Sequence, residues 1–133
     1  MKKTLKISLT MLLIMCSILS VSSSVLANTF TSYIDMAPNT ILEGNKYDFT
    51  EGTYGISIYP NSFDSFSYCD VYIDLYRKDL IGKTFLAGDE EAMSPTNQTY
   101  TFYRGYHESC KAFYYFKLVH GGLRANPVYL FSN

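Results

Sequence analysis

The chain has 133 residues, of which 47% are hydrophobic and 17% are charged, and its formal net charge at neutral pH is −1. This length and this apolar content fit one domain with a single core. A chain without excess positive charge lacks the electrostatic attraction that nucleic-acid binding requires, so we exclude that class of protein.

The first 27 residues have the three parts of a secretory signal peptide. Three of the first six residues are lysines, an apolar run extends from Ile7 to Val21, and Val25-Leu26-Ala27 ends the segment with side chains that signal peptidase accepts. We therefore expect cleavage after Ala27, which leaves a single secreted, extracellular domain over residues 28–133. Short lysine-rich leaders of this type are typical of bacteria.

Two alternatives to a cleaved leader remain open. The first is an uncleaved membrane anchor, although four hydroxyl residues interrupt an apolar run that would need about twenty predominantly apolar residues to span a bilayer. The second is a lipoprotein with Cys16 as the acylated residue. Met15 stands where a small residue is expected, and the apolar run continues past Cys16, so this alternative fits less well.

Cleavage after Ala27 changes the charge of the chain. The leader contains three of the eleven basic residues and none of the twelve acidic ones, so the mature net charge becomes −4. An acidic domain is a poor partner for an anionic membrane surface as well as for nucleic acid. We therefore expect no stable membrane insertion after cleavage.

Alternation of apolar and polar residues with period two dominates the mature segment and predicts strands. Seven candidate strands follow in chain order: 30–36, 53–59, 68–78, 83–86 (the weakest), 99–104, 111–120 and 127–132. Turn residues separate them, among them Ile81-Gly82-Lys83 after the longest strand and Gly88-Asp89 further on.

The strand at 68–78 has the clearest pattern. Its odd positions are apolar from Cys69 to Leu75, whereas its even positions alternate tyrosine with aspartate. This predicts a half-buried antiparallel strand with its odd residues inward. The strand at 111–120 repeats the pattern, with its even residues on the face of Cys110.

About seven short strands in about 100 residues predict an all-β fold, specifically an antiparallel two-sheet sandwich of immunoglobulin-like type. A small closed β-barrel is the alternative. The chain has no tryptophan, so the buried tryptophan of antibody domains is missing and the prediction concerns architecture, not family membership.

The mature segment contains two cysteines, Cys69 and Cys110, each near the start of a strong strand and on its apolar face. In an exported protein this arrangement predicts a disulfide between strands of facing sheets. Two free thiols or an intermolecular link are the alternatives.

The residues that could perform catalysis are few. His107, Glu108 and Ser109 have the residue types of a catalytic triad, but neighbours in one strand or turn point in different directions and cannot assemble one. His120 ends a strand, where we expect it to be solvated. Neither histidine has the spacing of a metal site, so we expect no catalytic residues, no metal and no cofactor, and we predict that the protein is not an enzyme.

Tyrosine is the least ordinary feature of the composition, with thirteen residues, all after the leader. The outward face of the strand at 68–78 carries Tyr68, Asp70, Tyr72, Asp74 and Tyr76. We predict that these five residues form a ligand-binding surface, because tyrosine combines a large contact area with a polar tip. The alternative is that the rings stabilise the sheet through cross-strand packing.

These patterns predict a secreted, non-enzymatic interaction protein that binds a protein or a cell-surface carbohydrate through a tyrosine-rich sheet face or adjoining loops. A carbohydrate-binding module, a bacteriocin-like or host-directed toxin, and an inhibitor of an exported enzyme are the alternatives. The fold and these residues do not rank them.

Overall fold

A computed structural model describes residues 28–63, 66–94 and 96–133. Every element of regular secondary structure in these ranges is a β-strand. The leader predicted over residues 1–27, its cleavage site and Cys16 lie outside the described residues. The nine strands are β1 (Asn28–Met36), β2 (Ile41–Glu43), β3 (Tyr47–Phe49), β4 (Gly52–Ser62), β5 (Cys69–Lys78), β6 (Lys83–Met93), β7 (Tyr100–His107), β8 (Cys110–His120) and β9 (Leu123–Ser132).

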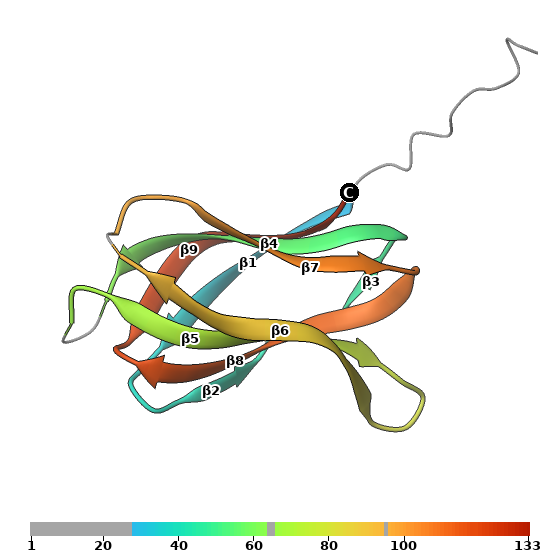
Figure 1. Cartoon of the computed structure of the whole chain (residues 1–133), viewed down its shortest axis with the longest axis horizontal. Coiled ribbons are helices and arrows are strands. Elements are labelled where there is room, and N and C mark those ends of the chain that lie inside the picture. The colour runs from blue at the N-terminus through green and yellow to red at the C-terminus, as the bar shows by residue number, and fades with distance from the viewer. Residues whose placement is uncertain (1–27, 64–65, 95) are drawn as a thin grey trace, which may run out of the picture.

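The strands form two antiparallel sheets that lie one above the other (Figure 1). The first sheet has the order β1-β9-β4-β7, and the second has the order β2-β8-β5-β6, with β3 also paired to β8. The all-β, two-sheet prediction is confirmed. No strand pairing among the described residues joins the two sheets, so the closed-barrel alternative is wrong. In the first sheet β1 pairs with the last strand, whereas a constant immunoglobulin domain pairs its first strand with its second.

The core lies between the sheets and is built from their inward faces. The first sheet contributes nine buried hydrophobic residues: Ile34, Met36, Tyr54, Ile56, Ile58, Leu123, Ala125, Val128 and Leu130. The second sheet contributes ten: Phe49, Cys69, Val71, Ile73, Leu75, Met93, Ala112, Tyr114, Phe116 and Leu118. Period-two alternation therefore predicted the inward faces of β5 and β8 correctly.

The described residues form nine strands, and the prediction of about seven was too low. The two that were missed, β2 and β3, have three residues each, which is too short to show an alternation. Strand β6 was predicted to end at residue 86, but it continues to Met93. Gly88 was expected to turn the chain, yet it lies within β6, opposite Asp74.

Gly88 leaves room for the side chain of Asp74. A β-carbon at Gly88 would lie 1.9 Å from Asp74 Oδ1 and 2.9 Å from Asp74 Cα, which no real contact allows. The physical reason for this glycine is therefore the close approach of a neighbouring strand, not a turn.

One buried charge links the two sheets. Arg104 on β7 donates a hydrogen bond from Nε to the carbonyl oxygen of Ile73 on β5 (2.9 Å), and its Nη2 lies 2.9 Å from Glu91 Oε1 on β6. Its Nη1 also donates to the carbonyl oxygen of Tyr103 (3.1 Å). Because the contacts with Ile73 and Glu91 cross from the first sheet to the second, Arg104 fixes how the sheets sit at the β6–β7 edge.

Candidate functional site

The predicted disulfide is wrong, because the two cysteines lie far apart in the same sheet. Strands β5 and β8 are antiparallel neighbours, with Asp70 opposite His120 and Arg77 opposite Ala112. Cys69 and Cys110 therefore begin their strands at opposite ends of the sheet, and the eight residues from Asp70 to Arg77 alone span about 23 Å. A disulfide needs Cα atoms within about 7 Å.

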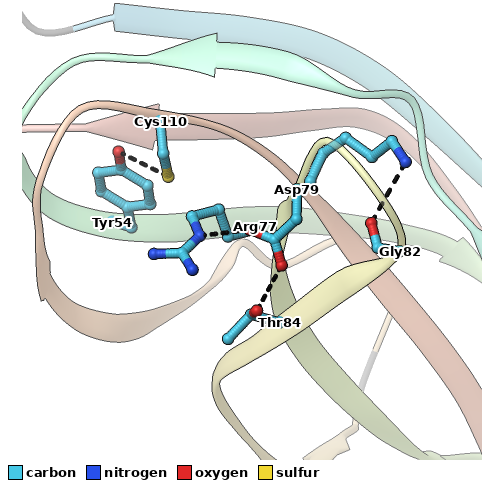
Figure 2. A network of polar contacts seen from close by, with 7 residues as sticks. Tyr54, Arg77, Asp79, Gly82, Thr84 and Cys110 are labelled. Atoms are coloured by element: carbon cyan, nitrogen blue, oxygen red, sulfur yellow. Dashed lines mark hydrogen bonds and ion pairs between the residues drawn. The ribbon is translucent and has the colours of Figure 1, made fainter.

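Both cysteines are free thiols. Cys69 is fully buried, and desolvation raises the pKa of its thiol to about 12. Cys110 is half-buried, with Sγ 3.7 Å from the Tyr54 hydroxyl (Figure 2). That hydroxyl also donates to the carbonyl oxygen of Glu108 (2.8 Å), and burial raises the pKa of Tyr54.

The even residues of β5, with Tyr68 immediately before the strand, lie on the outer face of the second sheet, which we call the tyrosine face. It is defined by Tyr68, Asp70, Tyr72, Asp74 and Tyr76. Tyr68 is 40% exposed and Tyr72 is 39% exposed, whereas the other three are half-buried. The tyrosine face thus has an open half, around Tyr68 and Tyr72, and a packed half around Tyr76.

In the open half, Tyr68 belongs to a group of three rings. Its ring stacks on that of His120 with centroids 4.6 Å apart, and Phe66 contacts the same imidazole at 4.1 Å. His120 is therefore held between strand and loop, and the expectation of a solvated histidine is wrong. Its Nε2 is buried and has no hydrogen-bond partner among the described residues.

Tyr72 lies between groups of opposite charge. Glu90 on β6 faces it on one side and Lys117 on β8 faces it on the other. A hydrogen bond between the Tyr72 hydroxyl and the Glu90 carboxylate raises the pKa of Tyr72. Next to it, burial raises the pKa of Asp74, and the positive charge of Arg104 opposes that shift. The open half therefore offers ring surface beside hydrogen-bond donors and acceptors.

The packed half is an aromatic cluster. The Tyr76 ring stacks on Phe113 (5.8 Å between centroids) and meets the edges of Phe85 (5.5 Å) and Tyr115 (5.9 Å). Phe113 is only 1% exposed although it lies on the outer face, so this end of the sheet is covered by side chains. For Tyr76 the alternative interpretation, cross-strand packing, describes the contacts.

A bulge brings Phe85 into this cluster. The β5–β6 register shifts between Leu75, which faces Ala87, and Tyr76, which faces Phe85. The extra residue, Leu86, reverses the parity of β6, so Phe85 and Lys83 join the face of Tyr76. Lys83 Nζ lies 4.6 Å from the centroid of Tyr76 and 4.5 Å from that of Tyr115.

The first sheet carries a second aromatic surface that the sequence analysis did not identify. We call it the first-sheet platform and define it by six outward residues: Thr31, Ser57, Thr101, Tyr103, Tyr129 and Phe131. Strand pairing aligns Thr31, Tyr129, Ser57 and Thr101 in one row across the sheet. Tyr103 and Tyr129 are exposed, and Phe131 meets Tyr103 edge-on at 6.0 Å. These six side chains carry no charge.

The residues considered for catalysis bond to backbone groups. His107 Nε2 lies 2.6 Å from the carbonyl oxygen of Arg104, and Ser109 Oγ accepts a hydrogen bond from the Glu51 N–H (2.8 Å). Neither of these contacts joins His107 to Ser109. No group of three or more His, Cys, Asp or Glu residues in the described part of the chain could hold a metal ion. The described residues also include no helix that could cross a bilayer.

We compared the chain with protein-family models, with curated proteins and with solved structures, and none of the three comparisons found a match. The two surfaces must therefore be interpreted from their own geometry.

Proposed function

We propose that this protein is a secreted, non-enzymatic binding protein, built as a β-sandwich of immunoglobulin-like type, whose tyrosine face contacts a protein or a cell-surface carbohydrate. The observation that carries the proposal is the exposure of Tyr72 on a strand held by neighbours on both sides, with Tyr68 also exposed immediately before that strand. Tyrosines on a rigid sheet lose little entropy on binding and offer both a ring and a hydroxyl.

The chemistry of the open half limits its partner. Tyr72 lies between the Glu90 carboxylate and the Lys117 ammonium, and Asp70 is next along the strand. A partner that presents hydroxyl or amide groups beside a flat apolar face can use the ring and both charges. Sugar rings and peptide segments have this combination.

A carbohydrate-binding module that uses the first-sheet platform is the second candidate function. Its support is the row of uncharged hydroxyl groups beside Tyr103, Tyr129 and Phe131. The Ser57 and Thr101 hydroxyls bond to each other at 2.8 Å, so they are fixed in position. A neutral polysaccharide needs ring faces and hydroxyl partners but no counter-charge.

Export can be tested separately from binding. N-terminal sequencing of the protein recovered from the medium should begin at Asn28, because Val25-Leu26-Ala27 fits the specificity of signal peptidase. Recovery of only the full-length protein in the membrane would contradict secretion. A lipid adduct on Cys16 would establish the lipoprotein alternative instead.

The two binding surfaces can be separated with one pair of variants. Retention of the chain on insoluble cell-wall polysaccharide is measured for Tyr72→Ala and for Tyr129→Ala, which are exposed to a similar degree on opposite sheets. Loss with Tyr72→Ala alone supports the tyrosine face, and loss with Tyr129→Ala alone supports the platform. If the chain is not retained at all, the carbohydrate partner is excluded for both surfaces. Growth-inhibition assays test the toxin alternative, and assays of exported hydrolases test the inhibitor alternative.

A further inference from the structure

The hairpin between β5 and β6 ends in two exposed aliphatic side chains. Leu80 is 100% exposed and Ile81 is 92% exposed, and the hairpin projects beyond the rest of the two sheets (Figure 1). Single exposed hydrophobic residues are common, but turns are normally built from small polar residues and glycine. Two adjacent large aliphatic residues at a projecting tip therefore call for a function.

Polar contacts on either side fix the shape of this turn (Figure 2). The Asp79 carboxylate accepts hydrogen bonds from Arg77 Nε (2.7 Å) and from the Thr84 hydroxyl. The Asp79 N–H and Lys78 Nζ both donate to the carbonyl oxygen of Gly82, at 3.3 and 3.2 Å. These contacts tie the two ends of the turn together, while Leu80 and Ile81 are exposed to solvent between them.

A lysine-lined cavity that is open to solvent lies at the base of the same hairpin. Its volume is about 260 Å³, and its lining consists of Glu43, Lys46, Lys78, Gly82, Lys83 and Phe113. The lining thus brings three lysines together with one glutamate. Glu43 Oε1 lies 2.7 Å from Lys46 Nζ and Glu43 Oε2 lies 3.7 Å from Lys83 Nζ, so Glu43 neutralises part of the positive charge. The sign of this local charge is opposite to that of the acidic mature chain.

We propose that the tip of the β5–β6 hairpin docks on an anionic phospholipid surface. Leu80 and Ile81 enter the boundary between headgroups and acyl chains, and the lysine-lined cavity receives a lipid phosphate. Apolar residues next to lysines are the combination that binds proteins to such interfaces. An apolar pocket on a partner protein would accept the two aliphatic side chains but would leave an excess of positive charge, because the single carboxylate of Glu43 cannot balance three lysines.

This contact goes beyond the proposed function and uses another part of the molecule. Strand β5 runs from Cys69 to Lys78, so Tyr68 lies at one end of it and the hairpin tip at the other. Two side chains at a turn tip anchor a protein on a membrane surface without spanning it. The overall acidic charge does not prevent this, because salt at physiological concentration screens charges beyond about 8 Å.

A tryptophan at the tip provides a direct test, because the natural chain contains none. The segment 28–133, which contains all nine strands, is prepared with Leu80→Trp and mixed with vesicles of phosphatidylglycerol and phosphatidylcholine in equal parts. The emission should shift to shorter wavelength and be quenched by brominated acyl chains. The matched control is Tyr129→Trp, which is also exposed but lies in β9 on the first sheet, and its emission should not change. Unchanged emission from Leu80→Trp would overturn the proposal.

Cosedimentation with the same vesicles tests the two parts of the site. Leu80→Ser should weaken binding about tenfold or more, as expected for loss of a buried leucine side chain. Lys78→Gln should weaken it about fivefold, whereas Glu43→Gln should strengthen it, because it frees Lys46 and Lys83. Since Leu80 contacts nothing, the Tm of Leu80→Ser should equal that of the unmodified chain.

Three results would overturn the proposal. One is equal binding to pure phosphatidylcholine vesicles, which would remove the role of the lysines. Another is unchanged vesicle binding of Leu80→Ser. The third is absence of vesicle binding together with Leu80-dependent binding to a purified protein, which would assign the tip to a protein pocket.

Discussion

Removal of the Arg104 side chain should destabilise the fold strongly. Arg104 is buried, its guanidinium donates to the Ile73 carbonyl oxygen, and its Nη2 lies 2.9 Å from the Glu91 carboxylate. Breaking a buried ion pair from one side costs about 3–5 kcal/mol, because the other charge stays buried without a partner. The Glu91 side chain is 20% exposed, so water reaches it and the lower end of this range applies. For Arg104→Met we therefore expect a loss of about 3 kcal/mol, a large share of the ~5–15 kcal/mol that a domain has.

Urea unfolding followed by circular dichroism measures this loss, provided that the slope of the unfolding free energy against urea concentration is the same for the variant and the unmodified chain. The matched control is Arg124→Met, because Arg124 pairs with Asp35 at 3.2 Å but both side chains are exposed. That change should cost under about 1 kcal/mol. The double variant Arg104→Met with Glu91→Leu should recover much of the loss, since no charge then stays buried. A loss below about 1 kcal/mol for Arg104→Met would refute the assignment of Arg104 as the link between the sheets.

Three further predictions concern single residues. Under denaturing conditions both thiols, Cys69 and Cys110, should react with a thiol reagent without prior reduction. In the folded protein Cys110 should react before Cys69, because burial raises the pKa of the Cys69 thiol to about 12. A linked Cys69–Cys110 peptide would contradict the pairing of β5 with β8. Gly88→Ala should lower stability by about 2 kcal/mol, because its β-carbon would overlap Asp74 and shift the backbone; unchanged urea unfolding would be evidence against that close approach. Asp74→Asn should raise the Tm at neutral pH, because burial raises the pKa of Asp74 and the folded state therefore disfavours its charged form. This gain in Tm should disappear as the pH falls through the pKa that Asp74 has in the folded state. A gain in Tm that does not depend on pH would point to another cause.

The alternation of apolar and polar residues predicted correctly which side chains of the long strands face the core. The inward residues of β5 and β8 follow from period two, and the same rule places Arg104 inward, two positions after Phe102. Strands β2 and β3 were missed because three residues cannot show a period.

The cysteine error has a different physical origin. Alternation tells which face of a strand a residue occupies, but it does not tell which strands are neighbours. Cys69 and Cys110 both face inward, as predicted, yet they begin antiparallel neighbours and so lie at opposite ends of one sheet. Pairing is a non-local property, and it also decides that Gly88 faces Asp74.

The candidate site was predicted in part for the same reason. Alternation correctly placed Tyr68, Tyr72 and Tyr76 on the outer face of β5. The burial of Tyr76 depends on the β6 bulge and on Phe113 of the neighbouring strand, which no local pattern contains. The first-sheet platform could have been found from residues 127–132, where Tyr129 and Phe131 alternate with Val128 and Leu130.

Protection of individual tyrosines tests the proposed binding face most directly. The chain is nitrated on its exposed tyrosines with and without isolated envelopes of the cells that produce it, and each site is quantified by mass spectrometry. Our proposal predicts that Tyr68 and Tyr72 are protected by the envelopes, while Tyr33 and Tyr103 on the first sheet react equally in both samples. Protection of Tyr103 and Tyr129 with no change at Tyr68 and Tyr72 would contradict it.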